Sequence, residues 1–166
     1  ANHDGDIDRA KNLIYLCAEA GADAAKFQHF TADTIVSDQG FKTLGEQQSH
    51  QSKWKKSVFQ TYKEASIDFS WTKDLKKECK KNNIDFMTAP YDLDYVNKVN
   101  KYISAYKIGS GDITWLKSIK MMASKKKPII LATGASSLKE VIQAVSEIKK
   151  INKKIILMQC NTNYSN

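Results

Sequence analysis

A short segment, residues 106–112, carries side chains that can hold an anionic small molecule. Its sequence is Tyr-Lys-Ile-Gly-Ser-Gly-Asp, so Lys107 supplies a cation, Ser110 a hydroxyl group and Asp112 a carboxylate. A lysine ammonium binds phosphate as a compact charge, and the glycines on either side of Ser110 let the backbone come close to a ligand. The segment begins as an apolar, β-rich run. It therefore predicts a site for a phosphorylated anion at the end of a buried strand.

Polar residues also stand at the carboxyl ends of the other predicted strands. These residues are Lys26, Gln28, Thr88, Thr133, Asn161, Thr162 and Tyr164. In a closed barrel of parallel strands, the carboxyl ends converge on one face, and the active site lies there. We therefore expect these residues to form one site together with Lys107 and Ser110.

Five short apolar segments, each a predicted strand, alternate with helical patterns. They cover residues 24–28, 85–89, 106–110, 129–133 and 155–160. Several are apolar at consecutive positions, which is typical of strands covered on both faces in a parallel sheet. The last four begin 21, 23 and 26 residues apart, which suits one strand and one helix joined by short loops. The chain is therefore predicted to be a repeat of βα units.

The predicted helices have recognisable stripes and ends. Apolar residues at helical spacing mark one helix that ends at Gly21, a residue suited to a left-handed C-terminal position. Ser137 and Glu140 form a Ser-x-x-Glu capping box ahead of another helix. Residues 29–71 lack a strand pattern and are rich in polar side chains, so they predict a long loop with one helix near residues 55–65. Long loops in compact α/β domains often act as lids or binding loops.

A run of βα units can close into a barrel or remain an open, doubly wound sheet. The sequence favours the barrel, because it has neither Gly-x-Gly-x-x-Gly after the first strand nor a Gly-x-x-x-x-Gly-Lys-Ser/Thr motif. The predicted fold is a TIM-type (β/α)8 barrel. A complete barrel takes about 250 residues. The 166 residues are therefore expected to form an incomplete barrel of about six βα units, counting the end of a first strand before Asn2.

The chain is strongly basic, with a formal charge of +8 from 26 Lys and Arg against 18 Asp and Glu. Basic proteins can bind nucleic acid through counterion release. Here the lysines gather on or just after predicted amphipathic helices, at residues 73–81, 117–127 and 149–154. Such lysines usually form solvated outer faces, so we expect no nucleic-acid partner. No apolar run reaches about 18 residues and no leader pattern is present, so we expect a cytoplasmic protein without a membrane partner.

The cysteines and histidines lack the spacing of metal ligands. They are Cys17, Cys79, Cys160, His3, His29 and His50. The cysteines are far apart and odd in number, so they are predicted to be reduced core residues. No residue of this chain is assigned to a metal. His3 is expected to line the pocket, whereas His29 and His50 are predicted to lie in loops.

Six segments of the chain resemble the sialic acid synthase family in order and spacing. They are residues 2–5 (Asn-His-Asp-Gly), 21–28 (Gly-Ala-Asp-Ala-Ala-Lys-Phe-Gln), 88–91 (Thr-Ala-Pro-Tyr), 105–112 (Ala-Tyr-Lys-Ile-Gly-Ser-Gly-Asp), 127–134 (Lys-Pro-Ile-Ile-Leu-Ala-Thr-Gly) and 160–164 (Cys-Asn-Thr-Asn-Tyr). Each segment alone is a weak signal, but six in register across nearly the whole chain are specific.

The resemblance implies a barrel that condenses phosphoenolpyruvate with an N-acylated amino sugar, commonly N-acetylmannosamine, to give N-acetylneuraminate and phosphate. It also implies a divalent metal, typically Mn²⁺, with ligands expected outside this chain. The family forms homodimers and carries a carboxyl-terminal antifreeze-like domain. That domain and the remaining barrel strands are expected to be absent from residues 1–166, and the isolated chain is expected to be inactive.

Two alternatives stay open at this point. The first is a legionaminic or pseudaminic acid synthase, which applies the same chemistry to a di-N-acetylated 6-deoxy sugar. The second is a barrel of another class, which binds a phosphate or sugar ligand without catalysis.

The resemblance also implies roles for individual residues. The residues that match the family's phosphoenolpyruvate ligands are Lys26, Lys107 and Ser110, and those that match its sugar-facing residues are Gln28, Asp112 and Tyr164. Asp112 is also the candidate for proton transfer. Many relatives have hydroxyl residues where this chain has Ala89 and Ala132. Thr88 or Thr133 is expected to compensate as a phosphoenolpyruvate ligand.

Overall fold

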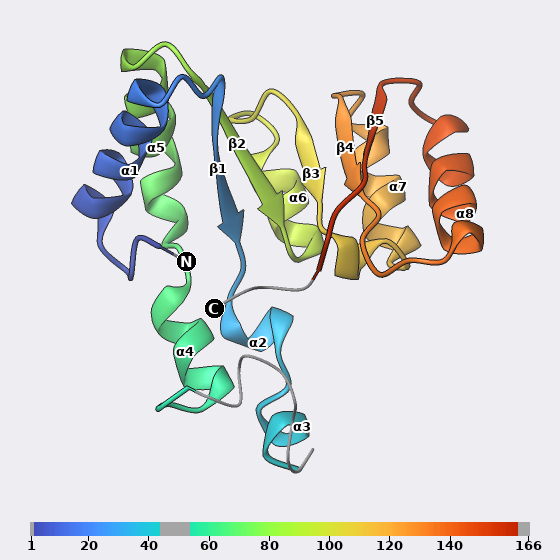
Figure 1. Ribbon diagram of the computed structural model, residues 1–166, viewed down its shortest axis with the longest axis horizontal. Coiled ribbons are helices and arrows are strands. Elements are labelled where there is room, and N and C mark those ends of the chain that lie inside the picture. The colour runs from blue at the N-terminus through green and yellow to red at the C-terminus, as the bar shows by residue number, and fades with distance from the viewer. Residues whose placement is uncertain (1, 44–53, 163–166) are drawn as a thin grey trace.

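The computed structural model describes residues 2–43 and 54–162 of the chain, and five parallel strands form the centre of this part (Figure 1). The strands are β1 (Ala24–His29), β2 (Asp85–Pro90), β3 (Tyr106–Ile108), β4 (Ile129–Ala132) and β5 (Ile155–Met158). They lie in the sheet in the order β1-β2-β3-β4-β5. All five strands predicted from the sequence are thereby confirmed.

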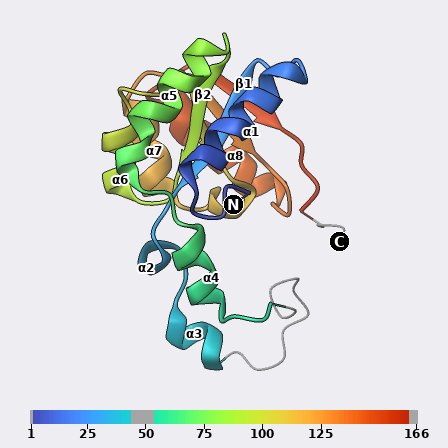
Figure 2. The ribbon, with the colours of Figure 1, turned by 90° about the vertical axis from the view of Figure 1, so that its left-hand side faces the viewer.

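Five helices of the described part pack along one side of this sheet (Figures 1 and 2). They are α1 (Ile7–Glu19), α5 (Thr72–Lys81), α6 (Leu93–Val99), α7 (Leu116–Ser124) and α8 (Leu138–Lys149). In a doubly wound sheet the strand order reverses and helices cover both faces. Sequential strand order with helices on one side is instead the arrangement of a (β/α) barrel. The predicted fold, an incomplete TIM-type barrel, is confirmed.

The segment between β1 and α5 contains more structure than the sequence predicted. The predicted helix near residues 55–65 is present as α4 (Val58–Ala65). Two short helices, α2 (Ala32–Ile35) and α3 (Asp38–Thr43), and a 3₁₀ turn, η2 (Phe69–Trp71), were not predicted. Helices α2, α3 and α4 lie beyond the carboxyl ends of the strands (Figure 1). This position is the one from which a segment can cover a barrel's active-site face.

Local hydrogen bonds fix the helix ends. The Asp6 side chain caps α1 by accepting from the backbone N–H of Arg9 at 2.8 Å. Gly21 follows α1 with φ of +78°, as predicted from its sequence position. The predicted capping box of α8 is present, with Ser137 and Glu140 each accepting from the other's backbone N–H.

The strand register divides the side chains between two faces of the sheet. Residues paired in register point to the same face, and successive residues alternate. Lys26 pairs with Met87, and the next pair along the strands is Phe27 with Thr88. Thr88 also pairs with Tyr106, the residue before Lys107. Lys26 and Lys107 therefore share one face, called here the inner face.

The opposite face packs on the helices and forms the core. Buried side chains there include Tyr106, Ile108 and Leu131 from the strands, with Val96 and Ile119 from α6 and α7. Burial of these apolar side chains against the helices stabilises the sheet. The inner face is consequently left free of helices and can accommodate polar groups.

Candidate functional site

Two lysines on the inner face provide its positive charge. Lys26 lies exposed on β1, yet the surrounding protein displaces enough water to lower the pKa of its ammonium group. Burial also lowers the pKa of Lys107 on β3, and the nearby charge of Lys26 lowers it further. The charge of Lys26 lowers the pKa of Lys107, and an anionic ligand bound between the two lysines would offset this repulsion.

The ammonium group of Lys107 has hydrogen-bond donors that the described protein groups do not use. Its Nζ donates to the carbonyl oxygen of Ile108 at 2.9 Å. An ammonium group has three N–H donors. Within the described residues the other two have no protein acceptor, so they are available for phosphate or carboxylate oxygens.

Asp112 lies beside this cation, in the 3₁₀ turn η3 (Ser110–Asp112) that follows β3. Burial raises the pKa of its carboxyl group, and the attraction of Lys107 partly opposes that rise. A Cβ atom placed on Gly109 would lie 2.8 Å from Asp112 Oδ2. Glycine is therefore required at position 109 because the carboxylate occupies the space of a side chain.

Gln28 and Tyr91 complete the polar side of the site. Gln28 Nε2 donates to Tyr91 Oη at 2.8 Å. The same Tyr91 oxygen is 3.6 Å from the Cβ position of Gly109, so it lies between Gln28 and Asp112. Tyr91 was not predicted as a site residue. Its signal was its position, directly after the end of β2, in one of the six segments that resemble the family.

Tyr91 also joins the site to the segment that follows β1. Its ring contacts Phe30 edge to face, with centroids 6.1 Å apart. Phe30 in turn contacts Tyr62 of α4 at 5.5 Å. Contacts of this kind fix the relative orientation of aromatic rings. Helix α4 is thereby packed, through two rings, against the residue that holds Gln28.

Ser110 brings together the ends of three strands. Its Oγ accepts from the backbone N–H of Gly134, just after β4, at 3.1 Å. A Cβ atom on Gly134 would come within 2.7 Å of the Cys160 carbonyl oxygen and within 2.7 Å of Thr162 Cγ2, both after β5. The ends of β3, β4 and β5 thus converge, as expected for a barrel face.

The hydroxyl groups of Thr88 and Thr133, both predicted as ligand-binding groups, contact other protein groups instead. Thr88 is fully buried on the helix-facing side, where its Oγ1 lies 2.8 Å from His29 Nδ1. Thr133 Oγ1 donates to the carbonyl oxygen of Met158 at 3.0 Å and so supports the pairing of β4 with β5. The structure does not bring Thr88 to the two lysines. The corresponding inner-face positions belong to Ala89 and Ala132, which carry only methyl groups.

His29 is not a loop residue, contrary to the sequence-based prediction. It ends β1 and is completely buried. Its Nε2 lies 2.9 Å from Thr72 Oγ1, which itself donates to the Phe69 carbonyl oxygen at 2.7 Å. Thr72 must therefore accept from Nε2–H, which leaves Nδ1 as the acceptor of the Thr88 hydroxyl. Burial lowers the pKa of this neutral imidazole to about 4.

The hydrogen bonds of His29 and His3 also bear on whether these histidines can bind a metal ion. Both ring nitrogens of His29 are occupied, and His3 Nδ1 accepts from the backbone N–H of Gly5 at 3.1 Å. Across the part of the chain that the structure describes, no three His, Cys, Asp or Glu residues lie together in a way that could hold a metal ion. The residues described do not fit a metal centre. Two predicted residues, His50 and Tyr164, lie outside the described part of the chain.

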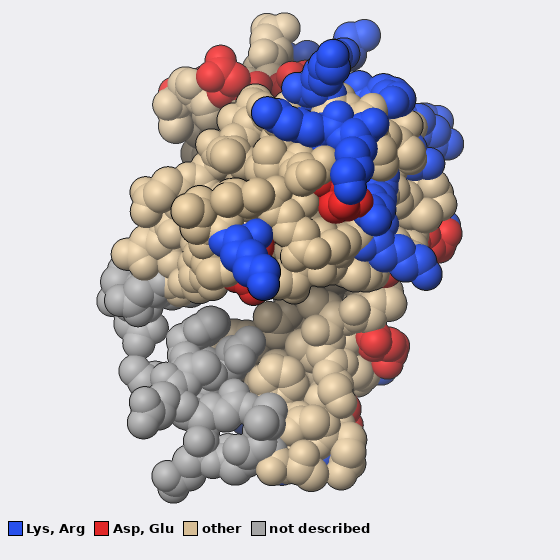
Figure 3. All heavy atoms as spheres, turned by 90° about the vertical axis from the view of Figure 1, so that its right-hand side faces the viewer, with Lys and Arg blue, Asp and Glu red and all other residues tan. Residues whose placement is uncertain are grey.

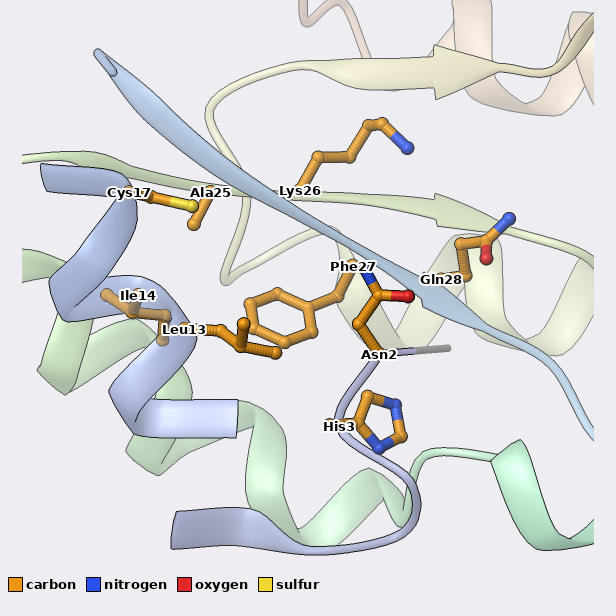
Figure 4. Close-up of a pocket in the computed structure, with 9 residues that line it drawn as sticks. All are labelled: Asn2, His3, Leu13, Ile14, Cys17, Ala25, Lys26, Phe27 and Gln28. Carbon is orange, nitrogen blue, oxygen red and sulfur yellow. The ribbon is translucent and has the colours of Figure 1, made fainter. Parts of the chain in front are cut away.

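A separate cavity of about 260 Å³ borders β1 and α1 (Figure 4). In Figure 4, Phe27 points toward Leu13 of α1, whereas Lys26 and Gln28 point to the other side of the strand. The walls of this cavity are mostly apolar, and His3 is among them. The sequence-based prediction placed His3 at the inner-face site, and that placement stays a prediction. The lining residues are Asn2, His3, Leu13, Ile14, Cys17, Ala25, Lys26, Phe27 and Gln28.

Further lysines lie on the outer helices. Figure 3 shows Lys and Arg side chains gathered on the side of the molecule that carries α8. Lys120 and Lys150 both pair with Glu147, and Lys120 does so at 2.8 Å. The predicted solvated face is therefore present. Within residues 2–43 and 54–162, no helix combines the length and apolar character needed to cross a bilayer.

The fold is a segment of a (β/α) barrel. At its strand ends Lys26, Lys107, Ser110 and Asp112 form a group, called here the inner-face cluster, whose chemistry suits an anionic small molecule. The chain belongs to the NeuB family, whose model matches residues 13–166.

Individual relatives are similar over nearly all of the chain. The N,N'-diacetyllegionaminic acid synthases of Campylobacter jejuni and Legionella pneumophila are 36% and 32% identical over 98% of this chain, which covers 49% and 47% of those proteins. The solved structure of N-acetylneuraminic acid synthetase from Leptospira borgpetersenii, in complex with citrate, gives a TM-score of 0.82 at 29% identity, over 98% of this chain and 52% of that one. The chain thus spans about half the length of these relatives.

Proposed function

We propose that the chain is part of the catalytic barrel of a nonulosonic acid synthase, which condenses phosphoenolpyruvate with an N-acylated amino sugar and releases phosphate. The observation that carries this proposal is the pair of lysines on the inner face, Lys26 and Lys107, next to the carboxyl group of Asp112. Membership of the NeuB family supports it.

In this proposal the lysines and Ser110 hold phosphoenolpyruvate. That substrate carries about three negative charges, and ammonium groups on rigid strands offset them without reorganising during the reaction. Ser110 is fixed by the N–H of Gly134. Its hydroxyl hydrogen is therefore free to be donated to a substrate oxygen. Ala89 and Ala132 leave the inner face without the two hydroxyl groups that many relatives have there.

The proposed reaction forms one carbon–carbon bond. Carbon C3 of phosphoenolpyruvate attacks the aldehyde carbon of the open-chain sugar, and the aldehyde oxygen becomes an alkoxide that takes up a proton. Water then adds to C2, which has become an oxocarbenium ion, and phosphate leaves. Asp112 is the candidate for this proton transfer, and burial raises the pKa of its carboxyl group.

The sugar is placed on the side of Gln28 and Tyr91. The Gln28 amide is oriented by the hydrogen bond from its Nε2 to Tyr91 Oη. Its carbonyl oxygen can then accept a hydrogen bond from a sugar hydroxyl or amide group. We also propose that Tyr164 faces the sugar and that the complete protein is a cytoplasmic homodimer. The family's divalent metal, Mn²⁺, would take its ligands from residues outside the described ones.

Two sugars are candidates. N-Acetylmannosamine would give N-acetylneuraminate, and a di-N-acetylated 6-deoxy sugar would give legionaminic or pseudaminic acid. Legionaminic acid is favoured by the 36% and 32% identity to two N,N'-diacetyllegionaminic acid synthases, against 29% for the sialic acid synthetase and 28% and 27% for two pseudaminic acid synthases.

Product analysis tests the proposal. The complete protein should be incubated with phosphoenolpyruvate, Mn²⁺ and each sugar in turn, and the products should be measured by mass spectrometry. The expected product is a nonulosonic acid, with more product from the di-N-acetylated sugar. A protein that binds phosphoenolpyruvate in calorimetry but makes no product from either sugar would instead be a non-catalytic binding barrel.

A further inference from the structure

A small cavity lies under the inner-face cluster, where β2 and β3 separate. These strands are paired in register at one position, Thr88 with Tyr106. The residues that follow on each strand border a cavity of about 10 Å³. That volume is near the least that admits one water molecule. The lining residues are Ala89, Pro90, Lys107, Ile108, Asp112, Trp115, Ser118, Ile119 and Met122.

Ser118 of α7 is the unusual member of this lining. It is only 2% exposed, and its Oγ has no hydrogen-bond partner among the described residues. Buried hydroxyl groups are nearly always bonded to protein or to ordered water. Ser124, an exposed residue on the same helix, differs in that its hydroxyl group donates to the Met121 carbonyl oxygen at 2.7 Å. The Ser118 hydroxyl group therefore requires a hydrogen-bond partner, and the cavity that it lines is where such a partner can lie.

The polar groups that line the cavity can supply that partner's other bonds. Asp112 and Lys107 reach it from the site, and Ser118 reaches it from the helix. A buried water molecule needs two to four polar partners. The cavity is therefore just large enough for one water molecule, and Ser118, Asp112 and Lys107 are the polar members of a mainly apolar lining.

We propose that one water molecule occupies this cavity and links the Ser118 hydroxyl group to the carboxyl group of Asp112, which makes Ser118 a positioning residue for the site. The role in turnover rests on the proposed function, whereas the water itself does not. A bridging water that donates to the carboxylate favours its charged form and fixes its orientation.

Several ionisable groups act on Asp112 besides this water. Lys107 approaches it from β3, and Tyr91 Oη lies close to it after β2. Lys26 of β1 and Cys160 after β5 act on Lys107 and so indirectly on Asp112. A change at Ser118 leaves all four groups in place. Its effect can therefore be separated from theirs.

A crystal structure of the complete protein tests the water directly. The expected result is a water molecule within hydrogen-bond distance of both Ser118 Oγ and an Asp112 carboxylate oxygen. A Ser118 hydroxyl bonded to another protein group, or density without such a water, would overturn the proposal. This readout does not depend on turnover, so it stands even if the proposed synthase reaction is not observed.

The Ser118→Ala variant tests the positioning role. The Asp112 pKa, followed by ¹³C NMR of its carboxyl carbon in the resting protein, should rise by about half a unit to one unit, because one hydrogen bond to the charged form is lost. Ser124→Ala is the matched control and should leave that pKa unchanged. An Asp112 pKa that is the same in Ser118→Ala and wild type would contradict the positioning role.

Discussion

At the scale of single residues, the site depends on how closely Gly109 and Asp112 approach each other. The carboxylate of Asp112 lies where a side chain at position 109 would be. Lys107 attracts this carboxylate, whereas burial in the surrounding protein raises the pKa of the carboxyl group. A small displacement would move it relative to both the cation and a bound sugar.

Substitution of Gly109 by Ala should therefore impair catalysis more than stability. The new methyl group would meet Asp112 Oδ2 at 2.8 Å and displace it. We expect kcat to fall about 10- to 100-fold, because displacements near 1 Å can cost that much. Gly111→Ala is the matched control, since no atom lies within 4 Å of its Cβ position. Equal kcat values in the two variants would argue against this role for Asp112.

Which residues face the site was only partly predictable from the sequence. Lys26, Lys107, Ser110 and Asp112 were identified from their types and their resemblance to the family, and the structure brings them together. The assignment of Thr88 depended on strand register, which a sequence does not show. Because Thr88 pairs with Phe27, its side chain points to the helices.

At the scale of elements, His29 connects β1, β2 and α5. Its ring lies 2.8 Å from Thr88 of β2 and 2.9 Å from Thr72, the first residue of α5. Both bonds are available only while the imidazole is neutral, because Nδ1 accepts a hydrogen bond. The ring also packs against Phe69 and Tyr95, with centroids 5.9 and 5.6 Å away.

This network makes stability depend on pH. The pKa of His29 is about 4 in the folded protein and 6.5 in an unfolded chain, so the unfolded chain binds more protons between these two pH values. The contribution of the neutral ring is complete above pH 6.5 and is lost as pH falls toward 4. The total loss should be about 3 kcal/mol.

Urea unfolding of the complete protein at pH 7, 6, 5 and 4 measures this effect. His29→Gln keeps a donor and an acceptor but does not titrate, so its free energy of unfolding should fall less steeply with acidification. His3 titrates in both proteins and cancels in the comparison. The same slope in the variant and the wild type would exclude His29 as the cause.

The five strands were predicted from the sequence, whereas helices α2 and α3 were not, and this difference has a physical reason. The five strands are short segments rich in apolar residues, so all five were predicted from the sequence. Helices α2 and α3 have four and six residues, too few for a buried stripe to show a helical period. They are held instead by local bonds such as Thr34 N–H to the Thr31 carbonyl oxygen at 3.1 Å.

At the scale of the whole molecule, β5 is the least covered strand of the described sheet. Ile156, Leu157 and Met158 are 53%, 51% and 41% exposed. These side chains point to both faces of the sheet, and neighbouring exposed apolar side chains usually mark a contact surface. We propose that further parts of the complete protein cover β5 and supply the rest of the site.

The 166-residue chain on its own should therefore release no phosphate from phosphoenolpyruvate and either sugar in the presence of Mn²⁺. It should also bind a hydrophobic dye more strongly than the complete protein, because β5 is uncovered. Phosphate release by the isolated chain, at a rate close to that of the complete protein, would show that its site is already whole.

The most direct test of the proposed function is the apparent KM for phosphoenolpyruvate in the complete protein and in Lys107→Met, measured by sugar-dependent phosphate release. Methionine keeps much of the length of lysine but removes the charge. We expect phosphate release that requires the sugar, and an increase in KM of about 10- to 100-fold in Lys107→Met, since a charged hydrogen bond is lost. Lys117→Met on the outer helix α7 should have the wild-type KM. A wild-type protein that releases no phosphate, or a Lys107→Met variant with an unchanged KM, would contradict the proposed function.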